Sequence, residues 1–483
     1  MLDQRLIDDV MRWASELDLA FSDGVGGRRQ VPFTLTPSPI APAVFSSLKE
    51  NSSLLGKLTQ ALSEDGDTIE NLHAPLTAGD AFFAELLSIH RELHHDDTVL
   101  PRVPLLLQRS DFMLDVAAGP QLVECNSIAA GMAPFGEQIH HLHSTIRRQF
   151  PAAFSRFTQT SEGGLVSNPA IEKFADALTI AAQRIRREHQ SAGAATFLMV
   201  VQDNEDNIFD QHLLERALVQ RGVRTFRRTF RELHAQLSSG PNQRLLLQGE
   251  AAVDVVYLRA GYQYRDYLAT DLDTRRCCDA LRATRIFIER HRVAVNATVD
   301  QQLATSKRSQ QFLTGASVEQ LGAYGLDRDE ATAMKSILTE MRSLDRNSVD
   351  FLSESEESAN WVLKNQGEGG GHCLFDKAMV QKIDSLNERD YAAWTLMRRL
   401  RPVERAAPTV IVRNGNSDCV AGLVSELGLF TAHFGGDAVL PGDEPNSAYL
   451  GYLVRSKPPG ATEGGIHSGY GALDSLIFNE GSR

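Results

Sequence analysis

The segment from Val362 to Gly371 places a lysine at the end of an apolar run, directly before a glycine-rich loop. Three consecutive glycines close the loop, so its backbone can approach a ligand and point N–H groups at phosphate oxygens. Lys364 adds a positive charge, and Glu368 could hold a divalent cation that bridges phosphates. The glycine spacing matches neither a Walker A loop nor a Rossmann fingerprint. Taken alone, the segment is equally compatible with a flexible turn beside a solvated acid.

A second pair of polar residues, Glu124 and Asn126, follows an apolar stretch. Residues two apart on a strand project to the same face. A carboxylate beside a carboxamide suits Mg²⁺, which prefers oxygen ligands. The alternative is a strand edge that carries two exposed polar groups.

Further polar groups follow expected strands of an α/β unit. Asn207, Asp210 and Gln211 come after the apolar run 197–201, and the carboxyl ends of parallel strands are where ligands bind in such sheets. Asp210 could equally be a helix N-cap. Arg259 and Arg455 follow apolar runs, and arginines there can grip carboxylates in a bidentate manner, although surface arginines without such a role are common.

Three other clusters are set aside. The histidines lack the matched spacing and partner ligands of zinc sites; they are His90, His94, His95, His140, His141 and His143. The adjacent Cys277 and Cys278 are expected to fill a helix, because neighbouring cysteines rarely bridge. A basic run is expected to be a solvated face; it comprises Arg398, Arg399, Arg401 and Arg405.

Composition bounds the class of protein. The chain has 483 residues and a formal net charge of −13, which argues against nucleic acid or an anionic membrane as the main partner. No run of 18 apolar residues is present, and the acidic N-terminal stretch does not resemble a targeting peptide. Five cysteines without a CxxC motif favour a reduced, cytoplasmic protein.

Periodicity predicts a mixed α/β protein with more than one core. Helices are expected near 1–20, 81–95, 209–220 and 275–293, with Gly222 closing the third. Strands are expected at 197–201, 223–226, 253–258, 361–364, 394–398, 409–413 and 420–430. The strand–helix–strand pattern that starts near residue 196 predicts a parallel sheet, here taken as a separate small domain.

Taken in order, the motifs resemble those of eukaryotic-type glutathione synthetase over nearly the whole chain. The matching segments are Pro32–Leu35, Arg109–Met113, Glu124–Ile128, Asn207–Gln211, Val256–Arg259, Lys364–Gly371, Ser425–Gly428 and Arg455–Lys457. The resemblance implies an α/β ATP-grasp fold with an inserted parallel α/β substrate-binding domain and a glycine-rich lid. It divides the chain into an N-terminal helical and ATP-grasp part (1–195), the inserted domain (196–302) and a C-terminal ATP-grasp part (303–483) with the lid at about 335–415. It also implies a homodimer.

The resemblance assigns roles to individual positions. Catalytic residues would be Arg109, Lys307, Lys364 and Arg455, and metal ligands would be Glu124, Asn126 and Glu368. ATP would contact Glu124, Lys307, Lys364, Gln366, Glu368, Gly369, Gly370, Gly371, Phe375, Glu426, Lys457 and Glu463, with Met397, Arg398, Arg399 and Leu400 as the strand beside adenine. The peptide substrate and acceptor would contact Arg109, Ile128, Ala129, Ala130, Gly131, Glu205, Asn207, Gln211, Arg259, Tyr262, Arg455, Ile466 and His467.

The implied reaction is the ATP-dependent ligation of γ-glutamylcysteine to glycine. ATP converts the carboxylate to an acyl phosphate, the acceptor amine attacks, and glutathione, ADP and phosphate result. Two Mg²⁺ ions per site and fixed cations would stabilise the developing negative charge. A lid would keep water from the acyl phosphate.

Departures from the family pattern leave alternatives open. Ala129 and Gly131 stand where the family usually has serines, and Glu463–Ser468 replaces an alanine-rich loop over the acceptor. A different acceptor, such as β-alanine or serine, is therefore an alternative to glycine. A different thiol dipeptide, or a non-catalytic binder of nucleotide or thiol peptide, are the others.

Overall fold

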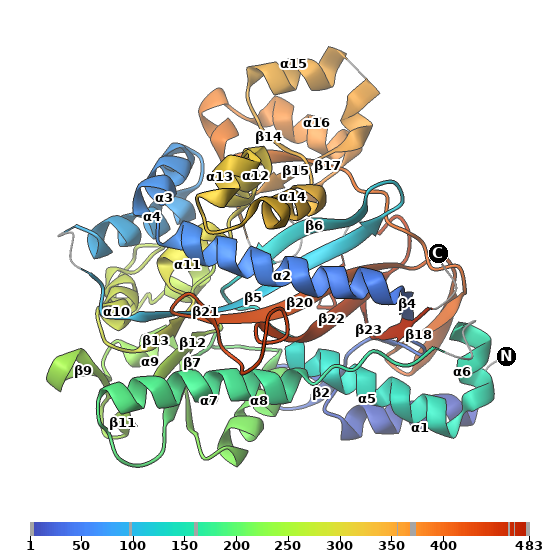
Figure 1. Cartoon of the computed structure of the whole chain (residues 1–483), viewed down its shortest axis with the longest axis horizontal. Helices are drawn as coiled ribbons and strands as arrows, with labels where there is room; N and C mark the ends of the chain where they lie inside the picture. The colour runs from blue at the N-terminus through green and yellow to red at the C-terminus, as the bar shows by residue number, and fades with distance from the viewer. Residues whose placement is uncertain are drawn as a thin grey trace.

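The computed structural model describes residues 4–95, 99–158, 163–354, 356–367, 373–461, 464–467 and 469–479. Its centre is a sheet of 13 strands with the order β19-β18-β3-β23-β22-β20-β5-β13-β12-β7-β8, to which β6 and β21 add beside β5 and β20 (Figure 1). The strands are β3 (Phe33–Thr34), β5 (Val103–Asp115), β6 (Gly119–Asn126), β7 (Thr196–Val200), β8 (Arg224–Arg228), β12 (Val255–Leu258), β13 (Ala294–Asn296), β18 (Thr409–Arg413), β19 (Asn416–Val420), β20 (Val424–Phe434), β21 (Asp437–Ala438), β22 (Tyr449–Lys457) and β23 (Ala472–Asp474).

One half of the sheet is antiparallel around β5, β20 and β22, and the other half is parallel. The parallel strands β13, β12, β7 and β8 form the predicted strand–helix–strand unit. β13 pairs in parallel with β5, so the parallel strands continue the same sheet. The division of the chain into domains remains a prediction.

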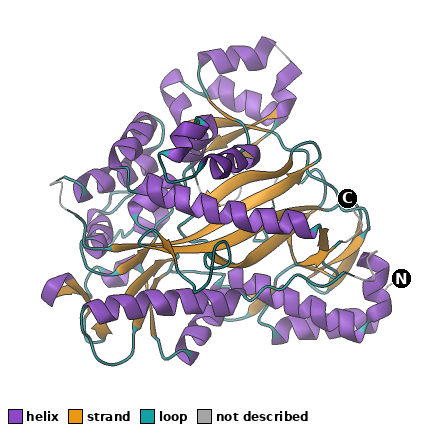
Figure 2. Ribbon diagram, viewed as in Figure 1, coloured by secondary structure: helices purple, strands orange, loops and turns teal. Residues whose placement is uncertain are grey.

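Helices cover both faces of the sheet (Figure 2). Along β20, Leu429 and Phe430 point to opposite faces and belong to two different hydrophobic cores. On one face α2 (Pro42–Ser63) packs against β20, and on the other α5 (Ala133–Gln149) and α7 (Ala170–Glu188) pack against β22. This two-sided covering explains why the central strands are buried almost continuously.

A smaller antiparallel sheet lies apart from the large one, at the top of Figure 1. Its order is β14-β17-β15-β16, and it packs around the buried Trp361. The elements here are β14 (Met341–Ser343), α15 (Arg346–Glu354), β15 (Trp361–Asn365), β16 (Cys373–Leu374), α16 (Asp376–Ser385) and β17 (Trp394–Arg398). This unit lies within the segment expected to form the lid.

The remaining elements connect these layers. The helices are α1 (Gln4–Glu16), α3 (Gly66–His73), α4 (Ala81–Leu93), α6 (Pro151–Thr158), α8 (Ile208–Gln220), α9 (Phe230–Leu233), α10 (Asp279–Glu289), α11 (Val299–Ala304), α12 (Lys307–Gly315), α13 (Val318–Gly322) and α14 (Arg328–Ile337). Short strands form three further sheets: β1 (Ala20–Ser22) with β2 (Arg28–Gln30), β4 (Ser38–Ile40) with β24 (Leu476–Phe478), and β9 (Leu237–Gly240) with β10 (Arg244–Leu247) and β11 (Ala251–Ala252). No described helix is both long and apolar enough to cross a membrane.

Most predicted elements are present, and four predictions were wrong in detail. Cys277 and Cys278 do not lie within a helix, because α10 begins at Asp279 with Cys278 as its N-cap. The expected strand 420–430 is two strands, because Gly422 adopts a φ of +66° and turns the chain between β19 and β20. The expected helix 275–293 is limited to α10, since residues beyond it lead into β13. Arg405 is not on a solvated face: it is buried and donates hydrogen bonds to the backbone carbonyls of Thr36 and Phe157.

Candidate active site

Strand register gathers the predicted charged residues on one face of the large sheet. Arg109 and Asp111 lie two apart on β5, opposite Asn126 and Glu124 on β6. On the other side of β5, β20 carries Glu426, which is paired with Arg455 on β22. Residues separated by more than 300 positions therefore meet because four neighbouring strands hold them in register.

Asp111 is the centre of this cluster. Its fully buried carboxylate accepts two hydrogen bonds from Arg109, at 2.7 and 2.8 Å, one from Asn126 at 3.1 Å and one from Arg455 at 3.1 Å. Gly428 lies opposite Asp111, and a Cβ there would collide with the side chains of Asp111 and Arg109. Sequence reasoning did not assign Asp111 a role, although its position two residues from Arg109 on one strand was a usable signal.

Glu124 lies between two lysines. Lys307 Nζ donates to Glu124 Oε2 at 2.8 Å, and Lys364 Nζ lies 3.4 Å from the Val123 carbonyl oxygen. Burial would raise the pKa of Glu124, but the charges of Lys307 and Lys364 hold that pKa well below its usual range. The site therefore keeps the Glu124 carboxylate ionised beside two lysine side chains.

Lys307 is positioned by the start of α12. Ser306 is the N-cap of this helix, and its hydroxyl accepts from Ser309 N. His73 Nε2 lies 2.8 Å from the same hydroxyl, while its Nδ1 lies 2.8 Å from the Ile69 carbonyl oxygen. Gln366, directly after β15, accepts a hydrogen bond from Arg308 N at 3.0 Å. These contacts tie α12 to α3 and to the small sheet. Neither His73 nor Ser306 was predicted to matter, because the sequence does not reveal a buried histidine–serine contact.

Arg455 and Lys457 extend the positive charge along β22. Arg455 donates to Glu426 as well as to Asp111. Burial would lower the pKa of Arg455, but the charges of Glu426 and Asp111 raise it. Burial lowers the pKa of Lys457, and the nearby charges of Arg455 and Lys364 add to that effect. A lysine with a lowered pKa beside other cations is a favourable position for an anionic ligand.

A pocket lies between the start of α5 and the parallel strands. It is lined by Ala130, Gly131, Gln211 and Arg259, together with Ala133, Pro134, Phe174, Met199, Asp210, Leu214 and Tyr257. Three buried polar atoms nearby have no hydrogen-bond partner among the described residues: Arg259 Nε, Asn207 Oδ1 and Gln211 Nε2. Buried polar groups are normally paired, so unpaired ones around a pocket mark a place for a polar ligand.

The sequence left two roles open for Asp210, a ligand contact or the N-cap of its own helix, and the structure excludes the second. It is not the N-cap of its own helix; Asn207 holds that position. Its carboxylate instead accepts from Met132 N at 3.0 Å and Phe135 N at 3.1 Å, at the start of α5. Asp210 therefore caps a neighbouring helix and holds the Ala129–Gly131 backbone beside the pocket. Ile128 lies in the apolar core just before this turn.

The C-terminal loop joins two parts of the site. Gly464 lies close to Glu426 and Lys457, and Ile466 is buried in the apolar core. The His467 imidazole stacks on Phe21 and lies 2.9 Å from the carboxylate of Asp206, which stands between Glu205 and Asn207. Glu205 is half-buried. The backbone N–H of Tyr262 donates a hydrogen bond to the Asp266 carboxylate at 3.1 Å.

The residues predicted beside adenine lie on the small sheet. Met397 is buried in β17, but the strand ends at Arg398, because its partner β15 begins at the opposite Trp361. Arg399 and Leu400 follow the strand. Arg398 pairs with Glu357, and Arg399 pairs with Asp376 and lies over the half-buried Phe375 ring. The predicted Glu368, Gly369, Gly370, Gly371, Glu463 and Ser468 lie outside the described residues.

Three carboxylates of the site could hold a metal ion. One carboxylate oxygen from each of Asp111, Glu124 and Glu426 lies within 4.8 Å of the others. An all-oxygen donor set is the kind that Mg²⁺ prefers, so the residues present fit that ion. Asn126 directs its amide nitrogen at Asp111, at 3.1 Å.

Fold and site together define a mixed α/β protein of the ATP-grasp class. The family model of the eukaryotic glutathione synthase ATP-binding domain matches residues 4–478, and the chain belongs to that family. It is 27% identical to the glutathione synthetase of Homo sapiens over 98% of this chain and 97% of the relative. It is 26% identical to the chloroplastic glutathione synthetase of Solanum lycopersicum over 98% of this chain and 84% of the relative. The solved structure of a glutathione synthetase-like effector from Globodera pallida shares the fold, with a TM-score of 0.71, 18% identity, and coverage of 99% of this chain and 98% of that one.

Proposed function

We propose that the chain ligates γ-glutamylcysteine to an acceptor amino acid, with glycine as the first candidate, at the expense of ATP. The observation that carries this proposal is the continuous cluster of Lys307, Lys364 and Arg455 around the carboxylates of Glu124, Asp111 and Glu426. A site for simultaneous binding of a polyphosphate and a carboxylate needs several fixed cations and room for a metal ion. The glutathione synthetases of Homo sapiens and Solanum lycopersicum support the choice of reaction.

The proposed chemistry proceeds through an acyl phosphate. The substrate carboxylate attacks the terminal phosphorus of ATP, ADP leaves, and the acceptor amine then displaces phosphate from the acyl carbon. Lys307 and Lys364 bind the transferring phosphoryl group, and Arg455 holds the carboxylate and then the developing oxyanion. Glu124 and Glu426, together with the predicted Asn126 and Glu368, would hold magnesium, which would supply positive charge against the phosphates.

The pocket at Arg259 is proposed to receive the dipeptide. Its γ-glutamyl end carries an ammonium and a carboxylate, which match the unpaired Asn207 Oδ1 and Arg259 Nε respectively. Gln211 Nε2 offers a further donor, while Arg227 already holds its Oε1 at 2.7 Å. The C-terminal loop, between Lys457 and Asp206, is proposed to cover the acceptor. A homodimer, two Mg²⁺ ions per site and a cytoplasmic location complete the proposal.

One experiment tests the reaction and the acceptor together. ADP release is measured with ATP, Mg²⁺ and γ-glutamylcysteine, and with glycine, β-alanine, serine or alanine added in turn; the peptide product is identified by mass spectrometry. Ligation predicts ADP release only when dipeptide and acceptor are both present. Thermal stabilisation by the ligands without product would contradict the ligase proposal and favour a non-catalytic binder.

A further inference from the structure

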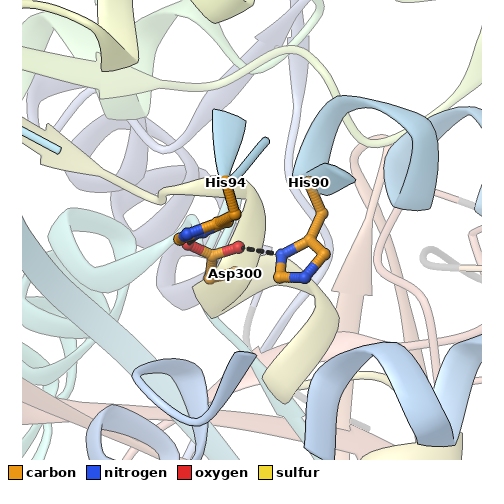
Figure 3. A group of neighbouring side chains, drawn as sticks. All are labelled: His90, His94 and Asp300. Carbon is orange, nitrogen blue, oxygen red and sulfur yellow. Dashed lines mark hydrogen bonds and ion pairs between the residues drawn. The ribbon is translucent and has the colours of Figure 1, made fainter. Parts of the chain in front are cut away.

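A second group of metal-ligating side chains lies away from the proposed active site. His90 is in the last turn of α4, His94 follows at its C-cap, and Asp300 is in the first turn of α11. Figure 3 shows the two imidazole rings on either side of the Asp300 carboxylate. His90 Nδ1 lies 2.7 Å from Asp300 Oδ1, and His94 Nε2 lies 3.1 Å from Asp300 Oδ2.

We propose that His90, His94 and Asp300 form a binding site for a divalent cation of the zinc class. Two histidines four residues apart lie on the same side of a helix, which is a common way to present two imidazole ligands to one ion. The ligand atoms of all three residues lie within 4.8 Å of one another. Three protein ligands leave a fourth position for water, which is the coordination of many open zinc sites.

The donor set distinguishes this group from the one at the active site. Of the described residues, two groups of three could hold a metal, and the other consists of Asp111, Glu124 and Glu426. Three carboxylates suit Mg²⁺, whereas two imidazoles and one carboxylate suit Zn²⁺ or Co²⁺. One chain therefore offers two cation sites of different chemical preference.

The surroundings hold the ligands in place. Arg102 Nη2 donates to Asp300 Oδ2 at 2.5 Å, and Arg102 Nε donates to Glu289 at 2.9 Å. Ligating carboxylates are commonly hydrogen-bonded by such outer groups, which orient them. Glu289 pairs with both Arg102 and Arg285, at 2.9 and 2.8 Å, so the formal charges of these three residues and Asp300 sum to zero. The C-terminal end of α4 also favours a cation.

The burial pattern provides an entry path. Asp300 and His90 are 3% and 5% exposed, whereas His94 is 40% exposed. An ion can reach the buried pair through the His94 side, and a bound ion would link α4 to α11. α11 leads directly to Ser306 and Lys307, so the linked helix is the one that precedes the proposed ATP lysine.

The first test measures how much zinc the full-length chain binds. Protein is incubated with Zn²⁺, desalted, and analysed by atomic emission spectrometry, in a Glu124→Gln background that weakens the carboxylate site. We expect about one zinc per chain, and at least a tenfold weaker retention in Glu124→Gln/His94→Ala, since a ligand has been removed. His141→Ala is the matched control, because His141 lies 3.3 Å from Glu137 in another exposed histidine–carboxylate pair.

A second measurement does not depend on tight retention. Co²⁺ bound by two imidazoles and a carboxylate gives visible absorption bands, and we expect these bands in the Glu124→Gln protein and their loss with His94→Ala. Equal zinc content and equal Co²⁺ spectra with and without His94 would overturn the proposal, as would the absence of both signals. Loss of both signals in the His141 control as well would also contradict it.

Discussion

Lys307 Nζ lies 2.8 Å from Glu124 Oε2, although the two residues are 183 positions apart in the chain. Glu124 comes from a sheet strand and Lys307 from the first position of a helix, so the pair joins the two layers of the site. A buried pair of this kind contributes little net stability, because desolvation offsets the attraction. Its position beside Lys364 instead indicates a functional use.

Removing the Glu124 charge should abolish ligation. In Glu124→Gln, Lys307 and Lys364 lose their shared counter-ion and a metal ligand is weakened, so we expect kcat to fall by about 100-fold or more. ADP release in the presence of all substrates measures this loss. Glu340→Gln, which removes an exposed carboxylate paired with Arg342 on the small sheet, is the control and should leave kcat unchanged. Near-wild-type turnover in Glu124→Gln would exclude the assigned role.

The cap of α12 should affect ATP binding as well as stability. Ser306→Ala removes the hydroxyl that accepts from Ser309 N and contacts His73, and such a cap contributes about 1 kcal/mol. Because Lys307 follows directly, we expect a higher KM for ATP in addition to a lower Tm.

Ser317→Ala is the matched control for this prediction. Ser317 caps α13 in the same way, with its hydroxyl accepting from Gln320 N at 3.2 Å, but in an exposed position. It should lower the Tm without changing the KM for ATP. If both variants shift the KM equally, the effect is general destabilisation and the positioning role is wrong.

Buried histidines should make the protein sensitive to mild acid. Burial lowers the pKa of His433 to about 4, and both ring nitrogens lack a hydrogen-bond partner among the described residues. The unfolded chain binds a proton near pH 6.5, before the folded chain does. Stability is therefore fully present above pH 6.5 and is lost as pH falls from 6.5 toward 4. His73 and His143 are shifted in the same direction.

His433→Gln isolates one of these contributions. Between pH 7.5 and pH 5.0, we expect the loss of unfolding free energy to be smaller in His433→Gln than in the wild type by about 2 kcal/mol. Urea titrations at the two pH values measure it. His141→Gln, at an exposed histidine, should keep the wild-type difference. An unchanged difference in His433→Gln would mean that His433 is not neutral in the folded state.

The sequence could predict the fold class and most central elements, because periodicity and apolar runs report burial directly. The strand at β15 and the helix at α8 lie where those patterns placed them. The expected strand 394–398 matches β17, whereas the expected strand 420–430 is divided into β19 and β20, which pair with different neighbours, β18 and β22. Strand ends are decided by pairing between distant segments, which local composition does not contain.

The candidate site, like the fold, could be predicted only in part from the sequence. Charged residues in short motifs, such as Glu124 and Arg455, could be selected from residue type and spacing. Ser306 and His73 could not, since their importance arises from a contact between segments far apart in the chain. His90 and His94 were set aside because the sequence shows no matched ligand spacing or partner ligand near them; Asp300, which contacts both, is more than 200 positions away.

The last prediction concerns Gly131, which occupies a position where the family usually has serine. A Cβ at Gly131 would meet the guanidinium of Arg259, which donates to the Ala129 carbonyl at 2.9 Å. The end of an arginine side chain can move, so Gly131→Ala should fold normally but displace Arg259 from the dipeptide pocket. We expect the KM for γ-glutamylcysteine to rise about tenfold, the effect of losing one hydrogen bond to a charged group, with the KM for ATP unchanged.

Gly136→Ala is the contrasting control: its Cβ would meet the backbone of Tyr452, which cannot move aside, so it should lower the Tm and leave the KM of the folded protein unchanged. A Gly131→Ala protein with wild-type KM for the dipeptide would show that Arg259 does not contact that substrate, because the same displacement would then have no consequence for binding.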